Sequence, residues 1–154
     1  MKLVIASGYF NPLGSHHLSY LKTARELGDG LIVIVNNDEQ VKLKGSIPFQ
    51  NQYHRCEIVQ SLKFVDGAII SLDNTKDISI SLSMLYGTQK DKVKQFIFAN
   101  GGDSTPNPEE VKVCNELGIE MVFGVGGKKT GSSSNLIEKA VFQYIKQRGW
   151  TVVQ

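Results

Sequence analysis

Residues 8–17 read Gly-Tyr-Phe-Asn-Pro-Leu-Gly-Ser-His-His and join an apolar strand to a helix. The apolar run Leu3–Ala6 precedes this stretch, and helical spacing follows from Tyr20. A glycine-rich strand exit that leads into a histidine at a helix start can hold a phosphate. The first N–H groups of a helix lack partners, and the helix dipole favours negative charge. The alternative interpretation is a plain turn followed by two surface histidines.

Short β-branched or aromatic runs alternate along the chain with stretches of helical spacing. The predicted strands are Leu3–Ala6, Leu31–Val35, Ala68–Ile70, Phe96–Ala99 and Met121–Phe123. Such unbroken apolar runs are typical of parallel strands that are covered on both faces. The alternation predicts an α/β protein with a Rossmann-like, doubly wound parallel sheet of five strands and helices on both faces. Ligands are expected at the carboxyl ends of the strands.

Apolar spacing also predicts the helices. A first helix has an apolar face from Tyr20 to Leu27 and ends at Gly28, a candidate C-cap. A second has its apolar face over residues 56–62, and a strongly amphipathic last helix covers residues 136–145. Residues 78–85 fit both a strand alternation and one helical face. We predict a helix there because consecutive parallel strands need a crossover connection.

The composition indicates a single globular domain over residues 1–154, with 41% hydrophobic and 21% charged residues. The formal net charge of +2 is too small to favour nucleic acid or an anionic membrane as a partner. The apolar stretches are too short to cross a bilayer, and Met1 opens directly into a strand without a leader. Cys56 and Cys114 suggest free thiols in a reducing compartment, so we expect a cytoplasmic protein.

Basic residues follow the second predicted strand. Lys42 and Lys44 come first, and His54-Arg55 begin the next helical stretch. An arginine can fork onto two phosphate oxygens, and a lysine contributes a mobile point charge. Lys44 and Arg55 are therefore candidate phosphate ligands, whereas Lys42 is more typical of a solvated charge.

Two later junctions offer further candidate contacts to a nucleotide. In the segment Gly101–Asp103, paired glycines allow a base or ribose to approach the backbone closely. The alternative there is a tight turn capped by Asp103. Ser132, Ser133 and Ser134 supply three hydroxyl groups at a helix start, which suits a leaving pyrophosphate. The alternative is a serine N-cap, which needs only one of the three.

Together these stretches resemble the HxGH nucleotidyltransferase superfamily of cytidylyltransferase-like enzymes. That superfamily carries Gly-x-Phe-Asp-x-x-His-x-Gly-His after the first strand and a serine/threonine stretch before a late helix. The matching phrases are His17–Leu21, Leu27–Asp29, Val35–Asp38, Leu43–Gly45, Val65-Asp66, Gly101–Asp103 and Ser132–Ile137. They run in family order from Lys2 to about Ala140. The chain most resembles the adenylyltransferase domain acting on heptose 1-phosphate and, next, glycerol-3-phosphate cytidylyltransferases.

The resemblance implies catalytic roles for His17 and Lys44. His17 would bind triphosphate oxygens and stabilise the transition state, and Lys44 would reach the phosphates of both nucleotide and acceptor. Arg55 matches an arginine near the acceptor phosphate. The nucleotide-binding residues that the resemblance implies are Gly8, Tyr9, Phe10, Asn11, His17, Gly101, Asp103, Ser132, Ser133 and Ser134. No side chain is expected to ligate a metal, and Mg²⁺ is expected to bind through the nucleotide phosphates.

The chain departs from the family motif at three positions. Gly14 stands where the motif has its first histidine, and His16 stands where it has glycine. Residues i and i+3 of a helical turn face the same way, whereas neighbours do not. Positions 14 and 17 could therefore share one phosphate, but His16 and His17 are not expected to. Asn11 replaces the commoner aspartate, which removes one negative charge near the phosphates.

These observations favour an enzyme, a nucleotidyltransferase. It would join a nucleoside monophosphate from ATP or CTP to a sugar-phosphate or polyol-phosphate acceptor and release pyrophosphate. The resemblance favours ATP, and therefore adenylyl transfer. The alternative is a nucleotide-binding module of the same fold that has lost catalysis, motivated by the exchange at positions 14 and 16. A weaker one is a doubly wound domain that binds another phosphate ligand. Because relatives in this superfamily are commonly homodimers, we expect a homodimer.

Overall fold

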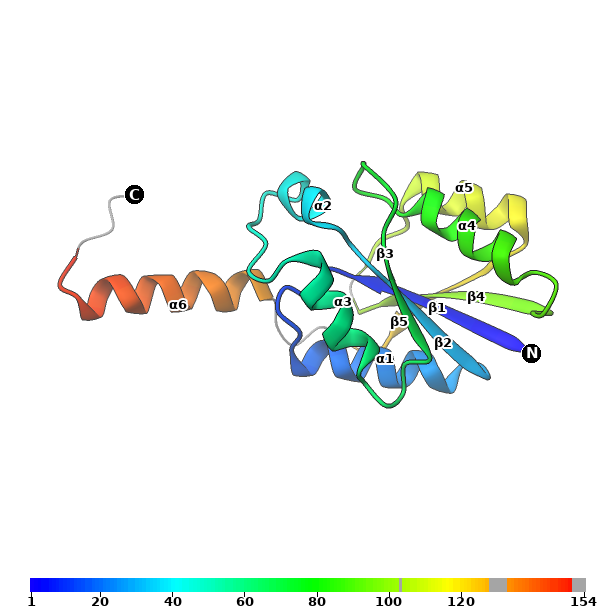
Figure 1. The fold of residues 1–154 in the computed structure, drawn as a ribbon, viewed down its shortest axis with the longest axis horizontal. Helices are drawn as coiled ribbons and strands as arrows, with labels where there is room; N and C mark the ends of the chain where they lie inside the picture. The colour runs from blue at the N-terminus through cyan, green and yellow to red at the C-terminus, as the bar shows by residue number, and fades with distance from the viewer. Residues whose placement is uncertain (103, 128–132, 151–154) are drawn as a thin grey trace.

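A parallel sheet forms the centre of the protein (Figure 1). The computed structural model describes residues 1–102, 104–127 and 133–150. The strands are β1 (Lys2–Gly8), β2 (Gly30–Val35), β3 (Gly67–Ile70), β4 (Gln95–Gly101) and β5 (Glu120–Val125). Their order in the sheet is β3-β2-β1-β4-β5, and every neighbouring pair is parallel. The predicted fold class and all five predicted strands are confirmed.

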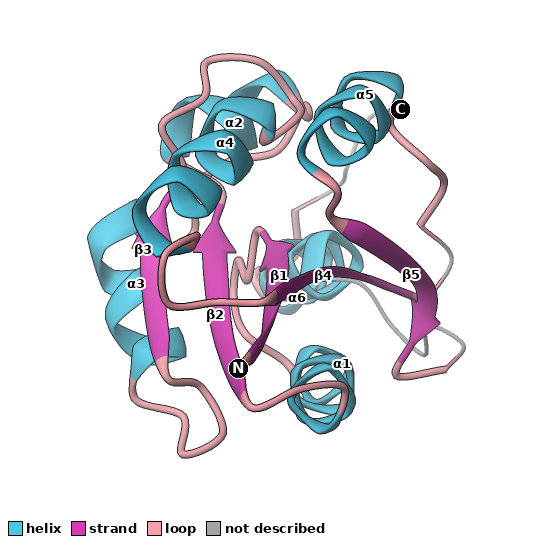
Figure 2. Ribbon diagram, turned by 90° about the vertical axis from the view of Figure 1, so that its right-hand side faces the viewer, coloured by secondary structure: helices cyan, strands magenta, loops and turns pink. Residues whose placement is uncertain are grey.

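Helices cover both faces of the sheet (Figure 2). They are α1 (Ser15–Glu26), α2 (Asp38–Leu43), α3 (Gln52–Gln60), α4 (Ser79–Gln89), α5 (Pro108–Leu117) and α6 (Ser133–Gln147). Val4 and Ala6 of β1 pack into a core with α1 and α3, and Leu3 and Ile5 pack into a second core with α4 and α5. Successive side chains of a strand point to opposite faces, so two cores require an unbroken apolar strand.

The structure changes some predicted helix boundaries. The prediction of a helix over residues 78–85 is confirmed by α4. The first helix ends before Gly28, because Leu27 is the C-cap in right-handed helical conformation. Gly28 instead allows a close approach of the backbone, since a Cβ atom there would lie 2.8 Å from the carbonyl oxygen of Lys2. Leu62 lies beyond the end of α3 but still packs on the core.

The sequence interpretation missed α2 and α5. The six residues of α2 are too few to show helical periodicity. The sequence does mark both ends of α5 with residues that commonly cap helices. Asn107 caps it by accepting hydrogen bonds from the N–H groups of Glu109 and Glu110 (3.0 and 3.3 Å), Pro108 is its first residue, and Gly118 follows it at a φ of 72°. These signals were sufficient to predict α5.

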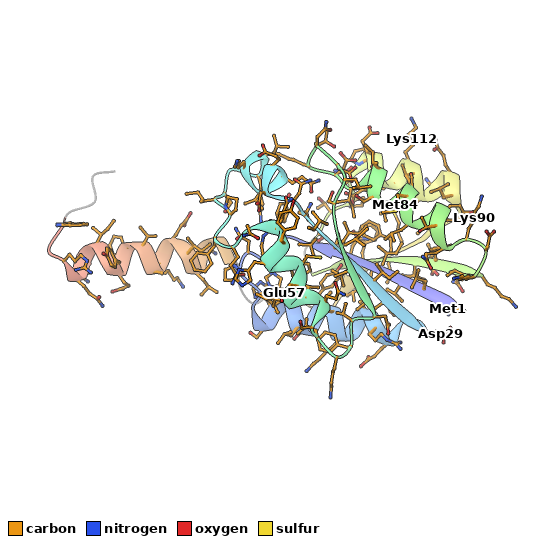
Figure 3. All side chains as sticks on the ribbon, in the orientation of Figure 1. Met1, Asp29, Glu57, Met84, Lys90 and Lys112 are labelled. Atoms are coloured by element: carbon orange, nitrogen blue, oxygen red, sulfur yellow. The ribbon has the colours of Figure 1, made fainter. Side chains whose placement is uncertain are left out.

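Helix α6 extends away from the sheet and its covering helices (Figure 1). The helix is confirmed, but its apolar side chains are not buried. Leu136, Val141, Phe142 and Tyr144 are each 50–54% exposed, and the side chains of most of α6 stand clear of other elements (Figure 3). Within the described residues, no helix combines the length and apolar character needed to cross a membrane.

Candidate functional site

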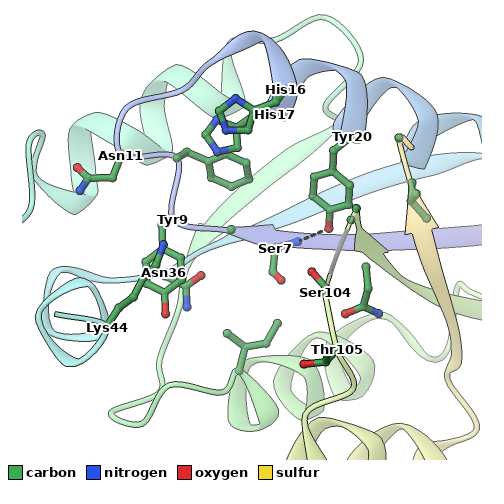
Figure 4. A pocket seen from close by; sticks show the side chains of 18 of the residues that line it. Ser7, Tyr9, Asn11, His16, His17, Tyr20, Asn36, Lys44, Ser104 and Thr105 are labelled. Carbon is green, nitrogen blue, oxygen red and sulfur yellow. Dashed lines mark hydrogen bonds between the residues drawn. The ribbon is translucent and has the colours of Figure 1, made fainter. Parts of the chain in front are cut away.

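A cavity of about 500 Å³ lies at the carboxyl ends of β1, β2, β4 and β5 (Figure 4). Its described lining residues are Ser7, Gly8, Tyr9, Phe10, Asn11, His16, His17, Ser19, Tyr20, Asn36, Val41, Lys44, Ser46, Lys76, Ile78, Asn100, Gly101, Gly102, Ser104, Thr105, Glu110, Val125, Gly126 and Gly127. Ligands of doubly wound folds bind at this edge of the sheet. The structure therefore brings the first loop, Lys44 and the glycines at the end of β4 (Gly101 and Gly102) into one site.

Phe10 and His17 pack together on one wall of the cavity. Phe10 is 1% exposed, has a left-handed φ of 49°, and makes an edge contact with the imidazole of His17, with ring centroids 5.1 Å apart. A Cβ atom at Gly8 would lie 2.8 Å from Cζ of Phe10, so the loop needs glycine there. Nδ1 of His17 accepts a hydrogen bond from the N–H of Gly14 (2.8 Å). The proton of the neutral imidazole therefore lies on Nε2, which is a hydrogen-bond donor.

His16 lies against His17 in the structure, and whether the two histidines can share one phosphate stays a prediction. Their ring centroids are 3.9 Å apart, and both rings line the cavity. A Cβ atom at Gly14 would lie 3.0 Å from Cε1 of His16, so the His16 ring occupies the space beside position 14. The helical-turn rule fails here because α1 begins at Ser15. The space beside position 14 is open because no helical turn precedes Ser15 and Gly14 has no side chain. The His16 ring turns into this space.

Tyr20 connects α1 to the strands beside the cavity. Its hydroxyl donates a hydrogen bond to the carbonyl of Ala99 (2.6 Å) and accepts one from the N–H of Ser7 (3.1 Å). Burial raises the pKa of Tyr20, so the hydroxyl stays protonated. Cβ atoms at Gly101 and Gly126 would lie 2.9 Å and 2.7 Å from Tyr20 atoms. Gly101 therefore makes room for Tyr20 as well as lining the cavity.

Lys44 reaches the cavity from the C-terminal end of α2. Its Nζ lies 4.3 Å from the centre of the Tyr9 ring, and both residues line the cavity. Burial, with a smaller contribution from the negative charge of Glu110, raises the pKa of the Tyr9 hydroxyl. Lys42, by contrast, is exposed and pairs with Glu39 at 3.2 Å, in agreement with the interpretation of a solvated charge.

Arg55 is not among the residues that line the cavity, and it is 1% exposed. Its guanidinium donates to the carbonyls of Tyr9 and Asn36 (2.7 Å each) and Gln50 (2.9 Å), and to Oδ1 of Asp38 (2.7 Å). This geometry corrects the expectation of a direct acceptor-phosphate contact. The same fork that suits a phosphate also suits carbonyl oxygens. Arg55 holds the segments that follow β1 and β2 in place.

The amide of Asn11 points away from the cavity centre toward the segment 47–50 (Figure 4). Its Nδ2 donates to the carbonyl of Ile47 (2.8 Å), and its Oδ1 accepts from the N–H of Phe49 (2.7 Å). The residue contributes to the lining but is only 5% exposed. An ionised aspartate could not donate to the carbonyl of Ile47, so asparagine suits this position better. The Asn11 side chain therefore holds this neighbouring segment, and the contact of residue 11 with a nucleotide stays a prediction.

Replacing Asn11 by aspartate should therefore lower the free energy of unfolding by about 1–3 kcal/mol, because a buried carbonyl loses its donor and faces a carboxylate. Urea unfolding followed by circular dichroism measures this difference. Asn51→Asp is the matched control. The Asn51 side chain only accepts a hydrogen bond, from the N–H of His54 (2.9 Å), and aspartate can do the same. Equal stability of the two variants would contradict the prediction.

The loop between β3 and α4 forms another wall of the cavity, and side chains at the start of α2 hold it in place by hydrogen bonds. Gln40, which is fully buried, donates through Nε2 to the carbonyls of Thr75 (2.7 Å) and Asp77 (3.0 Å). Asn37 donates through Nδ2 to the carbonyl of Asp73 (2.8 Å). The polar side chains at the start of α2 thus fix the loop that carries Lys76 into the cavity lining.

Glu110 lines the cavity from the first turn of α5, and sequence reasoning did not select it. It is half-buried, and its Oε2 accepts a hydrogen bond from the N–H of Ile78 (3.2 Å). Burial raises the pKa of the Glu110 carboxyl to about 7. The Ile78 N–H lowers that pKa, and the charges of Asp77 and Asp73 raise it further. The acidic first turn of a helix was the available signal, but only the fold brings it to the cavity.

This pKa predicts a pH-dependent stability. Between the ordinary pKa of 4.5 and the folded value of about 7, the folded protein binds more protons at Glu110 than the unfolded chain does. The contribution of Glu110 to the free energy of unfolding therefore falls as the pH rises through this window. Glutamine does not titrate, so Glu110→Gln should gain stability relative to the unmodified protein between about pH 5 and pH 8. Urea unfolding of both proteins at these pH values measures the change, and a pH-independent difference would contradict it.

Part of the predicted site falls outside the described residues, namely Asp103 and Ser132. Ser133 and Ser134 begin α6, which confirms the predicted helix start, but their side chains are also outside the description. Their contacts to phosphate stay predictions.

Comparison with known proteins identifies the family. The profile of the cytidylyltransferase-like family matches residues 5–137. The chain belongs to this family. This cytidylyltransferase-like protein is 34% identical to the FAD synthase of Pyrococcus horikoshii over 110 residues, which are 71% of the chain and 68% of that relative. It is 38% identical to the bifunctional protein HldE of Haemophilus influenzae over 147 residues, which are 90% of the chain and 27% of HldE.

A solved structure shows the same fold. The cytidylyltransferase-like protein superposes on the lipopolysaccharide core biosynthesis protein of Thermoplasma volcanium with a TM-score of 0.60 and 30% identity, covering 80% of this chain and 94% of that one. The chain spans only about a quarter of HldE, and its match to the FAD synthase of Thermococcus sibiricus covers 49% of that relative. The comparisons therefore establish the family of the chain, and they leave its substrates to be identified by experiment.

Proposed function

We propose that this protein transfers a nucleoside monophosphate from ATP or CTP to a phosphorylated acceptor and releases pyrophosphate, with ATP the favoured donor. The observation that carries the proposal is that one cavity at the strand ends gathers His17 of α1, Lys44 at the C-cap of α2, and Gly101 and Gly102 at the end of β4. Membership of a nucleotidyltransferase family supports the reaction class.

In the proposed reaction an oxygen of the acceptor phosphate attacks the α-phosphorus of the nucleotide in line. A P–O bond forms there as the bond to the β-phosphate bridging oxygen breaks, and pyrophosphate leaves with the electron pair. The acceptor phosphate is already ionised near neutral pH, so catalysis consists of positioning and charge stabilisation. The donor Nε2 of His17, the charge of Lys44 and the N-terminal end of α1 would stabilise the developing negative charge.

Mg²⁺ enters the proposal bound to the nucleotide phosphates, where it would neutralise part of their charge. Within the described residues no group of three or more His, Cys, Asp and Glu side chains could hold a metal ion. In the proposed reaction the nucleotide phosphates would supply oxygen ligands to Mg²⁺.

A sugar-phosphate or polyol-phosphate is the proposed acceptor class. Lys76, Ser104, Thr105 and Glu110 place charged and hydroxyl groups along the cavity lining, which suits a hydroxylated ligand. One relative is an FAD synthase. FAD is adenylylated flavin mononucleotide, so flavin mononucleotide belongs in the test.

The deciding experiment is Mg²⁺-dependent pyrophosphate release. ATP and CTP are crossed with heptose 1-phosphate, glycerol 3-phosphate, glucose 1-phosphate and flavin mononucleotide. Release with ATP and a sugar- or polyol-phosphate supports the full proposal, whereas release with flavin mononucleotide alone rejects the acceptor class. If no pair releases pyrophosphate but ATP binds in calorimetry, the alternative of a nucleotide-binding module without catalysis is favoured.

The position of His16 argues against that alternative. The exchange at positions 14 and 16 motivated it, yet the His16 ring lies beside position 14 and lines the cavity together with His17. The double substitution Gly14→His with His16→Gly tests the point. It should lower an existing activity or leave it similar, whereas activity appearing in a silent protein would favour the module.

We further propose that residues 1–154 form one domain and that the protein is cytoplasmic. We also propose that it forms a homodimer. The apolar side chains that α6 exposes support the homodimer, because an interface with a second copy would remove them from water. Cys56 and Cys114 are both free thiols, as a reducing compartment requires. Light scattering coupled to size-exclusion chromatography measures the oligomeric state, and a monomer at all concentrations would reject the dimer.

A further inference from the structure

Glu110 gives one part of the cavity a negative charge. It is the one acidic side chain among the described lining residues, whereas Lys44, Lys76 and two histidines contribute the groups that attract anions. No lysine or arginine in the described part of the chain forms an ion pair with its carboxylate. Above its pKa of about 7 the carboxylate is ionised and uncompensated by a salt bridge.

The surroundings of Glu110 make it a hydrogen-bond acceptor for a ligand. Its Oε2 accepts from the N–H of Ile78 (3.2 Å), and Oε1 has no hydrogen-bond partner among the described residues. The hydroxyl-bearing residues Ser104 and Thr105 line the same cavity from the segment that leads into α5 (Figure 4). An ionised carboxylate accepts hydrogen bonds only and repels anions. This part of the cavity therefore suits hydroxyl groups and disfavours a phosphate or carboxylate.

We propose that Glu110 is a specificity residue that accepts hydrogen bonds from hydroxyl groups on the non-phosphorylated part of the acceptor and excludes acceptors that carry a second anionic group there. The inference rests on the proposed function, since it divides the acceptor into a phosphate near Lys44 and a neutral polyhydroxyl part near Glu110. Tyr9, whose ring contacts Lys44, lines the same cavity as Glu110, so the two parts belong to one continuous site.

The test measures binding rather than turnover, by isothermal titration calorimetry at about pH 8. Two matched pairs serve as probes: glucose 1-phosphate with glucuronic acid 1-phosphate, and glycerol 3-phosphate with 3-phosphoglycerate. Each pair differs by a carboxylate in place of a hydroxymethyl group. In the unmodified protein the member without a carboxylate should, in at least one pair, bind about tenfold more tightly than the member with one. Glu110→Gln, which keeps an acceptor for the Ile78 N–H, should reduce that preference to about twofold.

Glu109→Gln is the matched control, because Glu109 lies in the same helical turn and is exposed outside the cavity lining. It should leave the preference unchanged. No preference in either pair, or an equal change in both variants, would overturn the inference. A weaker ATP affinity in Glu110→Gln with an unchanged preference would also overturn it and would assign Glu110 to the nucleotide ribose. Because no turnover is required, an inactive protein that still shows the preference rejects the proposed function alone.

Discussion

Replacing His17 by alanine is expected to lower kcat for pyrophosphate release by about 100- to 1000-fold, the usual effect of removing one preorganised donor to a transition state. The physical reason is the hydrogen bond from the Gly14 N–H to Nδ1, which directs the proton of His17 to Nε2. Steady-state kinetics with the nucleotide and acceptor identified in the panel measure the loss.

Two further variants separate catalysis from folding. His17→Asn retains an acceptor close to the Nδ1 position but lacks the Nε2 donor, so it should be as inactive as His17→Ala while keeping the loop conformation. His54→Ala is the matched control, because His54 is exposed in the first turn of α3 and does not line the cavity. Near-normal turnover in His17→Asn would reject the role given to the Nε2 donor.

Replacing Arg55 by alanine is expected to lower the free energy of unfolding by about 3–5 kcal/mol, because the fully buried guanidinium pairs with the partly exposed Asp38 and also holds buried carbonyl groups. Three carbonyl groups would lose a charged donor, and Asp38 would lose its cation. Urea unfolding measures the loss. Arg55→Lys keeps a charge but not the forked geometry, and it should lie between alanine and the unmodified protein.

The matched control is Arg25→Ala. Arg25 pairs with Asp66 at 3.3 Å at the surface, with its side chain 34% exposed, so its removal should cost about 1 kcal/mol or less. If Arg55→Ala were as stable as Arg25→Ala and raised only the KM for the acceptor, the acceptor-phosphate role first expected for Arg55 would be restored.

The strands β1, β2 and β4 were predictable because they are largely buried on both faces and therefore read as unbroken apolar runs. The edge strands β3 and β5 are less buried, but their β-branched and aromatic residues still marked them. The position of His17 and Lys44 at the cavity was predictable from motif resemblance. The environment of Arg55 was not predictable. Burial decides whether a guanidinium contacts a phosphate or backbone carbonyls, and the burial of Arg55 depends on the packing of α3 against the sheet. Tyr20 was counted as an apolar helix residue, yet its hydroxyl joins β1 to β4. Glu110 becomes a site residue only through the packing of α5 beside α4.

The side chains that hold the cavity walls also govern the thermodynamics of ligand binding. Asn11, Gln40 and Arg55 make their hydrogen bonds to neighbouring protein segments, so the loops they support are ordered before a ligand arrives. A nucleotide would then enter a prepared cavity, and little backbone entropy would be lost on binding. The heat-capacity change of association should accordingly reflect only the apolar area buried in the cavity, without the larger contribution of coupled folding.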